Sequence, residues 1–184
     1  MPIDGTLLTF DFAARTGYAV GDPDFDAGPT FAHHIFDSTG DNFGRHQSNV
    51  RGFLLRTIDR YKPVLIGYEQ PSLFSKTTPA TMIKLCSYAS TVEEVCLREN
   101  LGVPVRQINP SQVKKFWTGK GNAKKPDMVE RARKHGFLVT CDDEADAVAD
   151  WFWMVHCYGT EDQKRRFEQV RFEVDMGRSQ KAVL

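Results

Sequence analysis

Short apolar runs alternate along this chain with longer stretches whose apolar residues recur at helical spacing. Val50, Leu54 and Ile58, for example, lie four positions apart, which is typical of an amphipathic helix. Apolar runs of a few residues bounded by turn-forming residues are typical of strands. The pattern predicts strands over 6–12, 18–21, 29–36, 64–69 and 103–108, and helices over 43–61, 79–100, 109–117, 125–135, 143–158 and 165–174.

The order of these elements predicts an α/β fold with one mixed β-sheet. Three strands joined by short turns come first, so we expect them to be antiparallel, and the strands that follow are separated by helices, as in βα units. Helices should cover both faces of such a sheet. We predict one domain over residues 1–158 and a charged, partly helical C-terminal extension over residues 159–184.

Overall composition is ordinary for a globular protein, but charge is unevenly distributed. The chain has 24 basic and 24 acidic residues, so its net charge says nothing about partners. Locally, the segment from 114 to 134 holds eight basic and two acidic residues, and the segment from 142 to 150 holds five acids and no base. A basic segment followed by an acidic one indicates a polyanion held beside a metal site.

The four cysteines and the lengths of the apolar runs indicate the cellular compartment of the protein. Cys86, Cys96, Cys141 and Cys157 lack metal-binding spacing, and we expect single buried or partly buried thiols, which suit a reducing compartment. The N-terminus does not resemble a signal peptide, and no apolar run approaches the length of a membrane span. We therefore expect a cytoplasmic protein with no membrane partner.

Candidate metal ligands come from three predicted elements. Asp11 and Glu69 each end an apolar strand, and sites in open α/β sheets gather at such strand ends. Asp143 and Asp146 are three residues apart on a predicted helix, so they share one face. Four converging carboxylates would need cations, and oxygen-only ligands favour Mg²⁺, with Mn²⁺ as a substitute. Two such ions can support phosphodiester cleavage.

Simpler interpretations exist for the acids and for the histidines. An Asp at a strand end, such as Asp11, often bonds the backbone of the following turn. Asp142 and Glu144 are interpreted as first-turn acids that complement the helix dipole. Asp150, one turn beyond Asp146, is interpreted as a solvated acid or one that supports the ligands. The five histidines show no ligand spacing and are interpreted as surface or core residues: His33, His34, His46, His135 and His156.

Five lysines surround a glycine-rich loop and are candidate DNA contacts: Lys114, Lys115, Lys120, Lys124 and Lys125. Lysines in an accessible loop suit phosphate contacts, which carry affinity but not sequence information. The alternative is a solvated surface, and the acids that follow favour DNA. Phe116 and Trp117 lie among these lysines, and we expect them in the core, with base stacking by Trp117 as the alternative.

With these residues located, the chain resembles the RuvC family of Holliday junction resolvases, within the RNase H-like superfamily. The resemblance spans residues 7 to 155. Four segments carry it, in the family's order: Phe10-Asp11 with Thr16 to Ala19, Tyr68 to Pro71, Gln112 to Lys125, and Asp143 to Ala149.

The resemblance implies a homodimeric, Mg²⁺-dependent endonuclease that nicks opposed strands of a four-way DNA junction. By position, the four acids would be metal ligands, and Lys114 and Lys125 would lie near the scissile phosphate, with Lys125 part of the catalytic set. Phe74 would stack on bases at the junction centre, with a core position as its alternative. The helix over 79–100 resembles the helix that packs the two subunits together. The poor match outside the motifs resembles phage or viral relatives, which implies the cytoplasm of a bacterium or of a phage-infected host.

Other functions remain open from the sequence. Within the enzyme class these are a nuclease for a broader set of branched DNAs and an RNase H-type ribonuclease for RNA–DNA hybrids. A sugar-kinase or actin-like ATPase is disfavoured because we find no second glycine-rich phosphate loop and the chain is short for two lobes. A non-catalytic DNA-binding module on the same fold should have lost an acid, and this chain keeps all four.

Overall fold

The computed structural model describes residues 3–24, 28–40, 42–71, 78–99 and 101–177. The strands are β1 (Leu7–Asp11), β2 (Arg15–Gly21), β3 (Thr30–Ile35), β4 (Leu65–Glu69) and β5 (Val105–Ile108). The helices are α1 (Phe43–Tyr61), α2 (Pro79–Arg98), α3 (Pro110–Thr118), α4 (Lys125–Lys134), α5 (Asp142–Tyr158) and α6 (Glu161–Asp175). Each element predicted from the sequence pattern is present, in the predicted order.

The strands form one sheet in the order β3-β2-β1-β4-β5. The pairs β1–β2 and β2–β3 are antiparallel, and the pairs β1–β4 and β4–β5 are parallel. Turns can join the antiparallel strands directly, whereas α1 and α2 provide the crossovers that the parallel strands require. The predicted mixed sheet, with three antiparallel strands followed by βα units, is confirmed.

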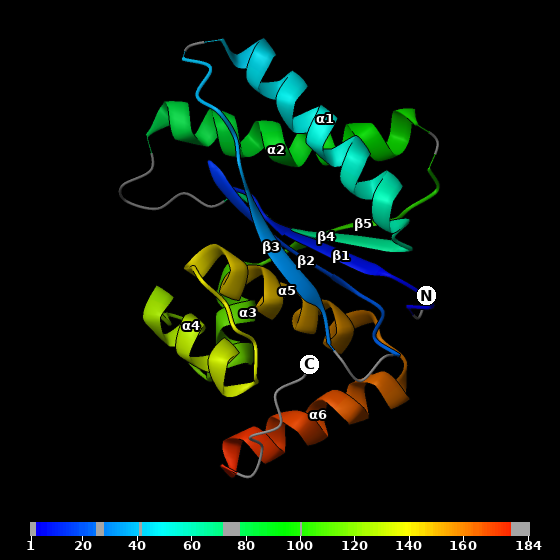
Figure 1. Ribbon diagram of the computed structural model, residues 1–184, viewed down its shortest axis with the longest axis vertical. Helices are drawn as coiled ribbons and strands as arrows, with labels where there is room; N and C mark the ends of the chain where they lie inside the picture. Colours follow the sequence, from blue (N-terminus) through cyan, green and yellow to red (C-terminus); the bar gives the residue numbers. More distant parts are fainter. Residues whose placement is uncertain (1–2, 25–27, 41, 72–77, 100, 178–184) are drawn as a thin grey trace.

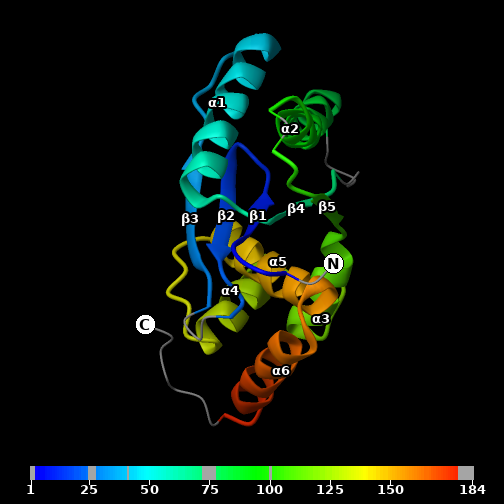
Figure 2. The ribbon, with the colours of Figure 1, turned by 90° about the vertical axis from the view of Figure 1, so that its right-hand side faces the viewer.

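Helices cover both faces of the sheet (Figures 1 and 2). On one face α1 and α2 pack over a core that includes Leu8, Phe10 and Ile66. On the other face α5 crosses the sheet with α3 and α4 beside it, over a core that includes Leu7 and Leu65. Because successive side chains of a strand point to opposite faces, the odd-numbered residues of β1 and β4 point toward α5.

The C-terminal helix α6 packs against α5 and shares its core. The rings of Phe167 and Phe152 stack with centroids 4.6 Å apart. The helix begins at Glu161, four residues before the predicted start, because Thr160 and Gln163 form a capping box that satisfies the first backbone N–H groups.

The remaining differences from the predicted boundaries have local causes. β2 begins at Arg15 rather than at residue 18, because it pairs along the whole of β1 after a three-residue turn. β5 begins at Val105 rather than at residue 103. The predicted end of α2 at Asn100 lies outside the described residues, as does Phe74.

The core position expected for Trp117 is confirmed. Its side chain is 1% exposed and stacks on His135 and Phe152, with ring centroids 4.5 and 5.3 Å apart. The expectation for the cysteines is wrong for two of them, because Cys86 and Cys157 are exposed; all four thiols are free. Among the described helices, none has the length and apolar character needed to cross a membrane.

Candidate active site

Two carboxylates end adjacent parallel strands on the side of the sheet that carries α5. Asp11 ends β1 and Glu69 ends β4. Both residues have odd numbers, so their side chains point toward α5. A hydrogen bond joins α5 to β1 near these strand ends: the buried Thr9 Oγ1 donates to the backbone oxygen of Ala147 at 3.0 Å. The first turns of α5 therefore lie beside the ends of both strands.

A glycine allows the start of α5 to approach the sheet. Gly17 on β2 pairs with Asp11, and a Cβ atom at Gly17 would lie 1.9 Å from the backbone oxygen of Asp143. Cβ atoms do not approach a backbone oxygen so closely, so only glycine fits there. The contact places the first turn of α5 over β2, next to the end of β1, and this gives a physical reason for the glycine that follows the first acid.

Five carboxylates gather here and form what we call the acid cluster: Asp11, Glu69, Asp143, Asp146 and Asp150. Burial raises the pKa of Asp11 well above its ordinary range, and the charges of neighbouring acids, first that of Glu69, raise it further. Burial also raises the pKa of Glu69 to about 7 and that of Asp146 to about 6. The structure thus brings the four predicted acids together, and their full ionisation needs nearby cations.

Asp150 is the fifth member. Of its two interpretations, a solvated acid or an acid that supports the ligands, the first is wrong. Its side chain is fully buried, and among the described residues neither carboxylate oxygen has a hydrogen-bond partner. Burial, followed by the charges of Glu69 and Asp11, raises its pKa well above the usual range. The spacing of seven residues from Asp143 already placed it on the same helix face, but only the packing of α5 on the sheet removes that face from water.

Cations from two other elements contact the start of α5. Arg15, on β2, makes an ion pair with Asp143 and a second, 3.0 Å long, with Asp142. Lys125, on α4, makes an ion pair with Asp142. Burial favours the neutral form of Asp142, but the hydrogen bond from Lys125, a backbone hydrogen bond and the charges of Lys125 and Arg15 together outweigh burial, so the pKa of this acid is lowered. Asp142 is therefore more than a helix-dipole acid, and Arg15 was missed because nothing in the sequence links residues 127 positions apart.

No protein-family profile matches the chain, but curated relatives do. The crossover junction endodeoxyribonuclease RuvC of Rickettsia bellii is 30% identical over 118 residues, which cover 62% of this chain and 73% of the relative. This chain belongs to the RuvC family. The same enzyme of Rickettsia akari is 32% identical over 103 residues, or 54% of this chain, and the match spans 63% of that relative's length.

Solved structures of Holliday junction resolvases share the fold. Thermus thermophilus RuvC in complex with a Holliday junction substrate superposes with a TM-score of 0.67 at 17% identity, over 84% of this chain and 94% of that one. The yeast mitochondrial Holliday junction resolvase Ydc2 gives a TM-score of 0.57 at 12% identity, over 96% and 85% of the two chains. These similarities confirm the predicted RNase H-like fold.

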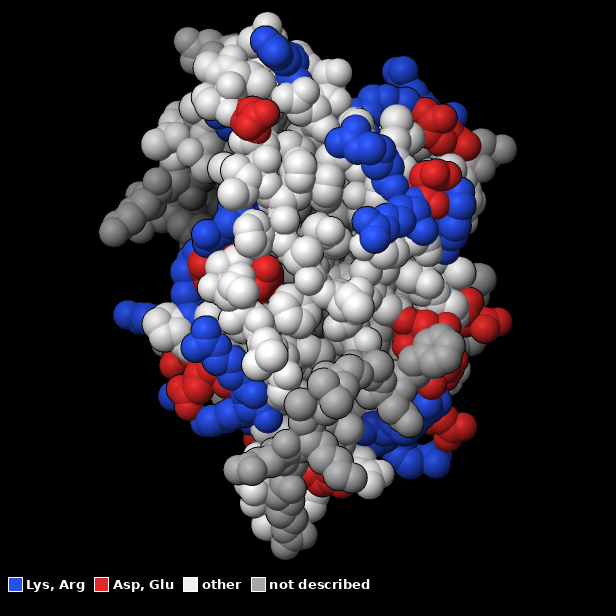
Figure 3. All heavy atoms as spheres, viewed as in Figure 1, with Lys and Arg blue, Asp and Glu red and all other residues white. Residues whose placement is uncertain are grey.

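Two of the five candidate lysines of this RuvC-family protein lie near the acid cluster. The charge of Lys114, which is half-buried on α3, lowers the pKa of Glu69 and Asp146 against the effect of burial. The charge of Lys125 does the same for Asp11 and Asp146. Lys115, Lys120 and Lys124 are exposed around the loop between α3 and α4. In the space-filling view, basic and acidic side chains lie next to one another over α4 and the start of α5, at the left (Figure 3).

The acid cluster has the donor set for a hard divalent cation. Its donors are carboxylate oxygens, the kind that Mg²⁺ and Mn²⁺ prefer. Asp146 Oδ1 and both oxygens of Asp150 are buried and have no hydrogen-bond partner among the described residues. Buried acceptors in native proteins are normally satisfied, so these oxygens, together with the raised pKa values, fit the presence of a bound cation.

A second group of ligand-type atoms lies on the other side of the first turn of α5. The Nδ1 of His33, the Sγ of Cys141 and a carboxylate oxygen of Glu144 all lie within 4.8 Å of one another. His33 comes from β3, and Glu144 is buried. The sequence interpretation of His33 as a surface or core residue and of Glu144 as a helix-dipole acid missed this contact, because β3 and α5 are about a hundred residues apart.

We predict that the metal-free protein loses stability as the pH rises. The folded protein keeps protons on Glu69 and Asp146 up to pKa values of about 7 and about 6, whereas the unfolded chain releases them near its ordinary values of about 4. Their contribution to stability is therefore fully present below about pH 4 and is lost as the pH rises through about 6 to 7. In EDTA, the melting temperature should be lower at about pH 8 than at about pH 5.

Added Mg²⁺ should reverse this loss at the higher pH, because it binds the ionised carboxylates. The Asp146→Asn variant should show a shallower pH dependence in EDTA than the unmodified protein. A pH dependence in EDTA that is equally steep in the Asp146→Asn variant and in the unmodified protein would contradict the burial of this acid.

Proposed function

We propose that this protein is a metal-dependent, structure-selective DNA endonuclease that resolves four-way (Holliday) junctions by paired phosphodiester hydrolysis. The observation that carries the proposal is the acid cluster at the ends of β1 and β4, with Lys114 and Lys125 beside it, in a chain of the RuvC family. Because its relatives are bacterial, we place the protein in the cytoplasm of a bacterium or of a phage-infected host.

The roles of the residues follow from their positions. Asp11, Glu69, Asp143 and Asp146 would hold Mg²⁺, with Mn²⁺ as a substitute. When bound, the metal lowers the pKa of a water nucleophile and stabilises the leaving oxygen. Asp150 is fully buried and its pKa is raised by burial and by the other acids, so a bound cation would favour its ionised form. Arg15 neutralises Asp143 and Asp142 at the start of the helix.

Substrate contacts would come from the basic loop. Lys114 and Lys125 lie where a scissile phosphate would meet the acid cluster, and Lys125 would exchange its partner Asp142 for the phosphate. Lys115, Lys120 and Lys124 are exposed and would contact phosphates further along the backbone. We retain Phe74 as a residue that stacks on bases at the junction centre.

We also propose that two copies pair through α2. The side of α2 away from the core carries two exposed apolar side chains, Ile83 (55% exposed) and Leu97 (81%). They are fourteen residues apart, which places them on nearly the same face of the helix. A pair of subunits would present two acid clusters to two opposed strands of a four-way junction.

Replacing Ile83 with glutamate should convert the dimer into monomers, because a charge on the paired face would lose its water. Sedimentation equilibrium measures this directly. Leu138→Glu, at an apolar residue that is 84% exposed away from α2, is the matched control and should stay dimeric. A dimer that persists in the Ile83 variant would contradict pairing through this face.

The deciding experiment uses purified protein on a synthetic, immobile four-way DNA junction. Matched duplex, fork and RNA–DNA hybrid substrates are run alongside, each with Mg²⁺ and with EDTA. We expect paired symmetric nicks on the junction, with metal only. Cutting of forks as well would indicate a nuclease for branched DNA in general, cutting of the hybrid alone a ribonuclease, and binding without cutting in Mg²⁺ or Mn²⁺ a DNA-binding module.

Replacing Lys125 with alanine should slow cleavage and weaken junction binding, most strongly at low salt. Losing one phosphate contact should reduce the slope of log K against log[salt] by about 0.9 if the contact is to duplex DNA. Lys134→Ala is a matched control at the other end of α4, where the lysine pairs with Glu130. An unchanged cleavage rate and salt slope in the Lys125 variant would mean that this lysine is a solvated surface residue that does not contact DNA.

A further inference from the structure

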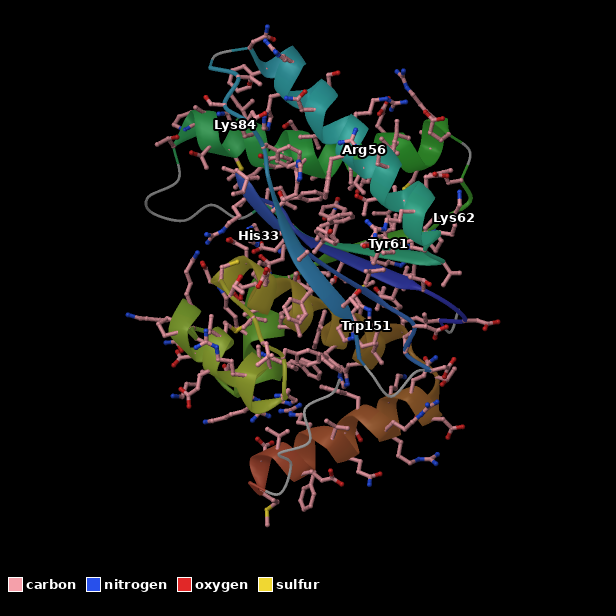
Figure 4. The ribbon with its side chains drawn as sticks, in the orientation of Figure 1. His33, Arg56, Tyr61, Lys62, Lys84 and Trp151 are labelled. Atoms are coloured by element: carbon pink, nitrogen blue, oxygen red, sulfur yellow. The ribbon has the colours of Figure 1, made fainter. Side chains whose placement is uncertain are left out.

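Three residues with different ligand atoms meet at the edge of the sheet, outside the acid cluster. The His33 Nδ1 lies 2.9 Å from Glu144 Oε1 and 3.8 Å from Cys141 Sγ. His33 is on β3, Cys141 is the residue that precedes α5, and Glu144 is in the first turn of that helix. Figure 4 shows His33 next to the start of α5. We propose that these three side chains form a site for Zn²⁺ or a similar borderline-soft divalent ion.

The ligand set favours zinc over the hard cations of the acid cluster. Imidazole nitrogen, thiolate sulfur and carboxylate oxygen are the three donors that zinc sites use, whereas Mg²⁺ takes oxygen. Tetrahedral zinc, with bonds of about 2.0–2.3 Å, places neighbouring ligand atoms about 3.3–3.7 Å apart. The two separations around His33 Nδ1, 2.9 and 3.8 Å, need only small adjustments to meet this geometry. Three protein ligands leave the fourth position to water.

The second oxygen of Glu144 is already held in place. Glu144 Oε2 accepts hydrogen bonds from the backbone N–H of Thr140 at 2.7 Å and from its hydroxyl at 2.9 Å. These bonds orient the carboxylate and leave Oε1 directed at His33. Carboxylate ligands of metals are typically fixed by such outer hydrogen bonds.

The position of Cys141 supports the same conclusion. It is the N-cap residue of α5, where Ser, Thr, Asp or Asn is preferred because the side chain caps the helix. Within the described structure the Cys141 side chain makes no capping bond, and its sulfur lies beside His33 instead. Cys141 is half-buried and His33 is exposed, so an ion can reach the site from solvent. On binding, the thiol proton passes to the solvent and the thiolate becomes the ligand.

The zinc site and the acid cluster are joined by one turn of α5. Gly17 pairs with Asp11 on one side and with His33 on the other, so the three residues lie in a row across the sheet. The first turn of α5 lies on the glycine in the middle of this row. An ion bound by His33, Cys141 and Glu144 would link the start of α5 to β3. Asp143 and Asp146, on the same helix, belong to the acid cluster. The zinc site itself does not depend on the proposed nuclease activity.

The test is binding of Zn²⁺, and of Co²⁺ as a spectroscopic substitute, by the purified full chain in excess Mg²⁺. We expect one Zn²⁺ per chain, a higher melting temperature with Zn²⁺, and a sulfur-to-cobalt charge-transfer absorption with Co²⁺. Cys141→Ser should abolish that absorption, because it removes the sulfur ligand. Both Cys141→Ser and His33→Ala should weaken Zn²⁺ binding about tenfold or more. Serine is a favourable N-cap, so the Cys141 variant should fold.

Two controls separate this site from other sulfur and acid groups. Cys157→Ser, at an exposed thiol outside the site, and Asp146→Asn, in the acid cluster, should both keep the cobalt absorption. Loss of the absorption in the Cys157 variant would overturn the assignment. So would the absence of stoichiometric Zn²⁺ binding at micromolar concentrations, or equal Zn²⁺ affinity of the unmodified and Cys141 proteins. In any of these cases His33 and Glu144 form only a hydrogen-bonded pair.

Discussion

Replacing Asp146 with asparagine is expected to lower the rate of junction cleavage roughly a thousandfold or more, since the metal's charge stabilisation contributes several kcal/mol. Asp146 is the acid of α5 that interacts electrostatically with both lysines of the site, Lys114 and Lys125. An amide in its place keeps the shape of the side chain but removes the negative charge that holds the metal. Single-turnover cleavage of the four-way junction measures the effect.

The same variant should bind the junction about as tightly as the unmodified protein, because removing a negative charge near a phosphate does not weaken its binding. It should also melt at an equal or higher temperature in EDTA at neutral pH. The ionised form of Asp146 is disfavoured by burial, which raises its pKa to about 6, and the neutral amide avoids that cost. The gain in melting temperature that Mg²⁺ gives the unmodified protein should shrink.

Asp59→Asn is a suitable control, because Asp59 is exposed on α1 and pairs only locally with Lys62. Its cleavage rate should not change. Undiminished cleavage by the Asp146 variant would refute the assignment of the acid cluster as the metal site.

Replacing Gly17 with alanine is expected to destabilise the fold by about 3 kcal/mol, the upper end of the usual cost of overpacking, because the new side chain would meet backbone rather than a flexible side chain. The new Cβ would lie 1.9 Å from the backbone oxygen of Asp143, and neither strand pairing nor the helix backbone can yield by the distance required. The start of α5 must move away from β2, which takes Asp143 and Asp146 away from Asp11. Cleavage should therefore fall together with stability.

Thermal or urea unfolding measures the loss, which for a domain of this size is a fall in melting temperature of about 6–12 °C. Gly44→Ala is the matched control. Gly44 lies in the first turn of α1, and its Cβ would meet only the Asn42 side chain, at an ordinary 3.6 Å. Alanine there should be neutral or stabilising by up to about 1 kcal/mol. Equal stability of the two variants would mean that α5 does not approach β2 as closely as described.

The sequence by itself determined the elements, their order and the faces of the site acids. Period-2 and helical patterns report which side of a strand or helix is apolar, and this placed Asp11 and Glu69 at strand ends and Asp143 with Asp146 on one helix face. The RuvC resemblance added the fold and the activity now proposed. The inferences about the elements, the fold and the helix and strand faces succeeded because each depends on local spacing or on a contiguous motif.

Tertiary structure alone decided which faces meet. It buried Asp150, paired Arg15 with Asp143, and brought His33 to Cys141 and Glu144. A periodic pattern states that a residue faces inward but not which residue lies opposite, because the partner comes from a strand or helix more than a hundred positions away. That choice is made when α5 packs on the sheet over Gly17, where the absence of a side chain sets how closely the two can approach.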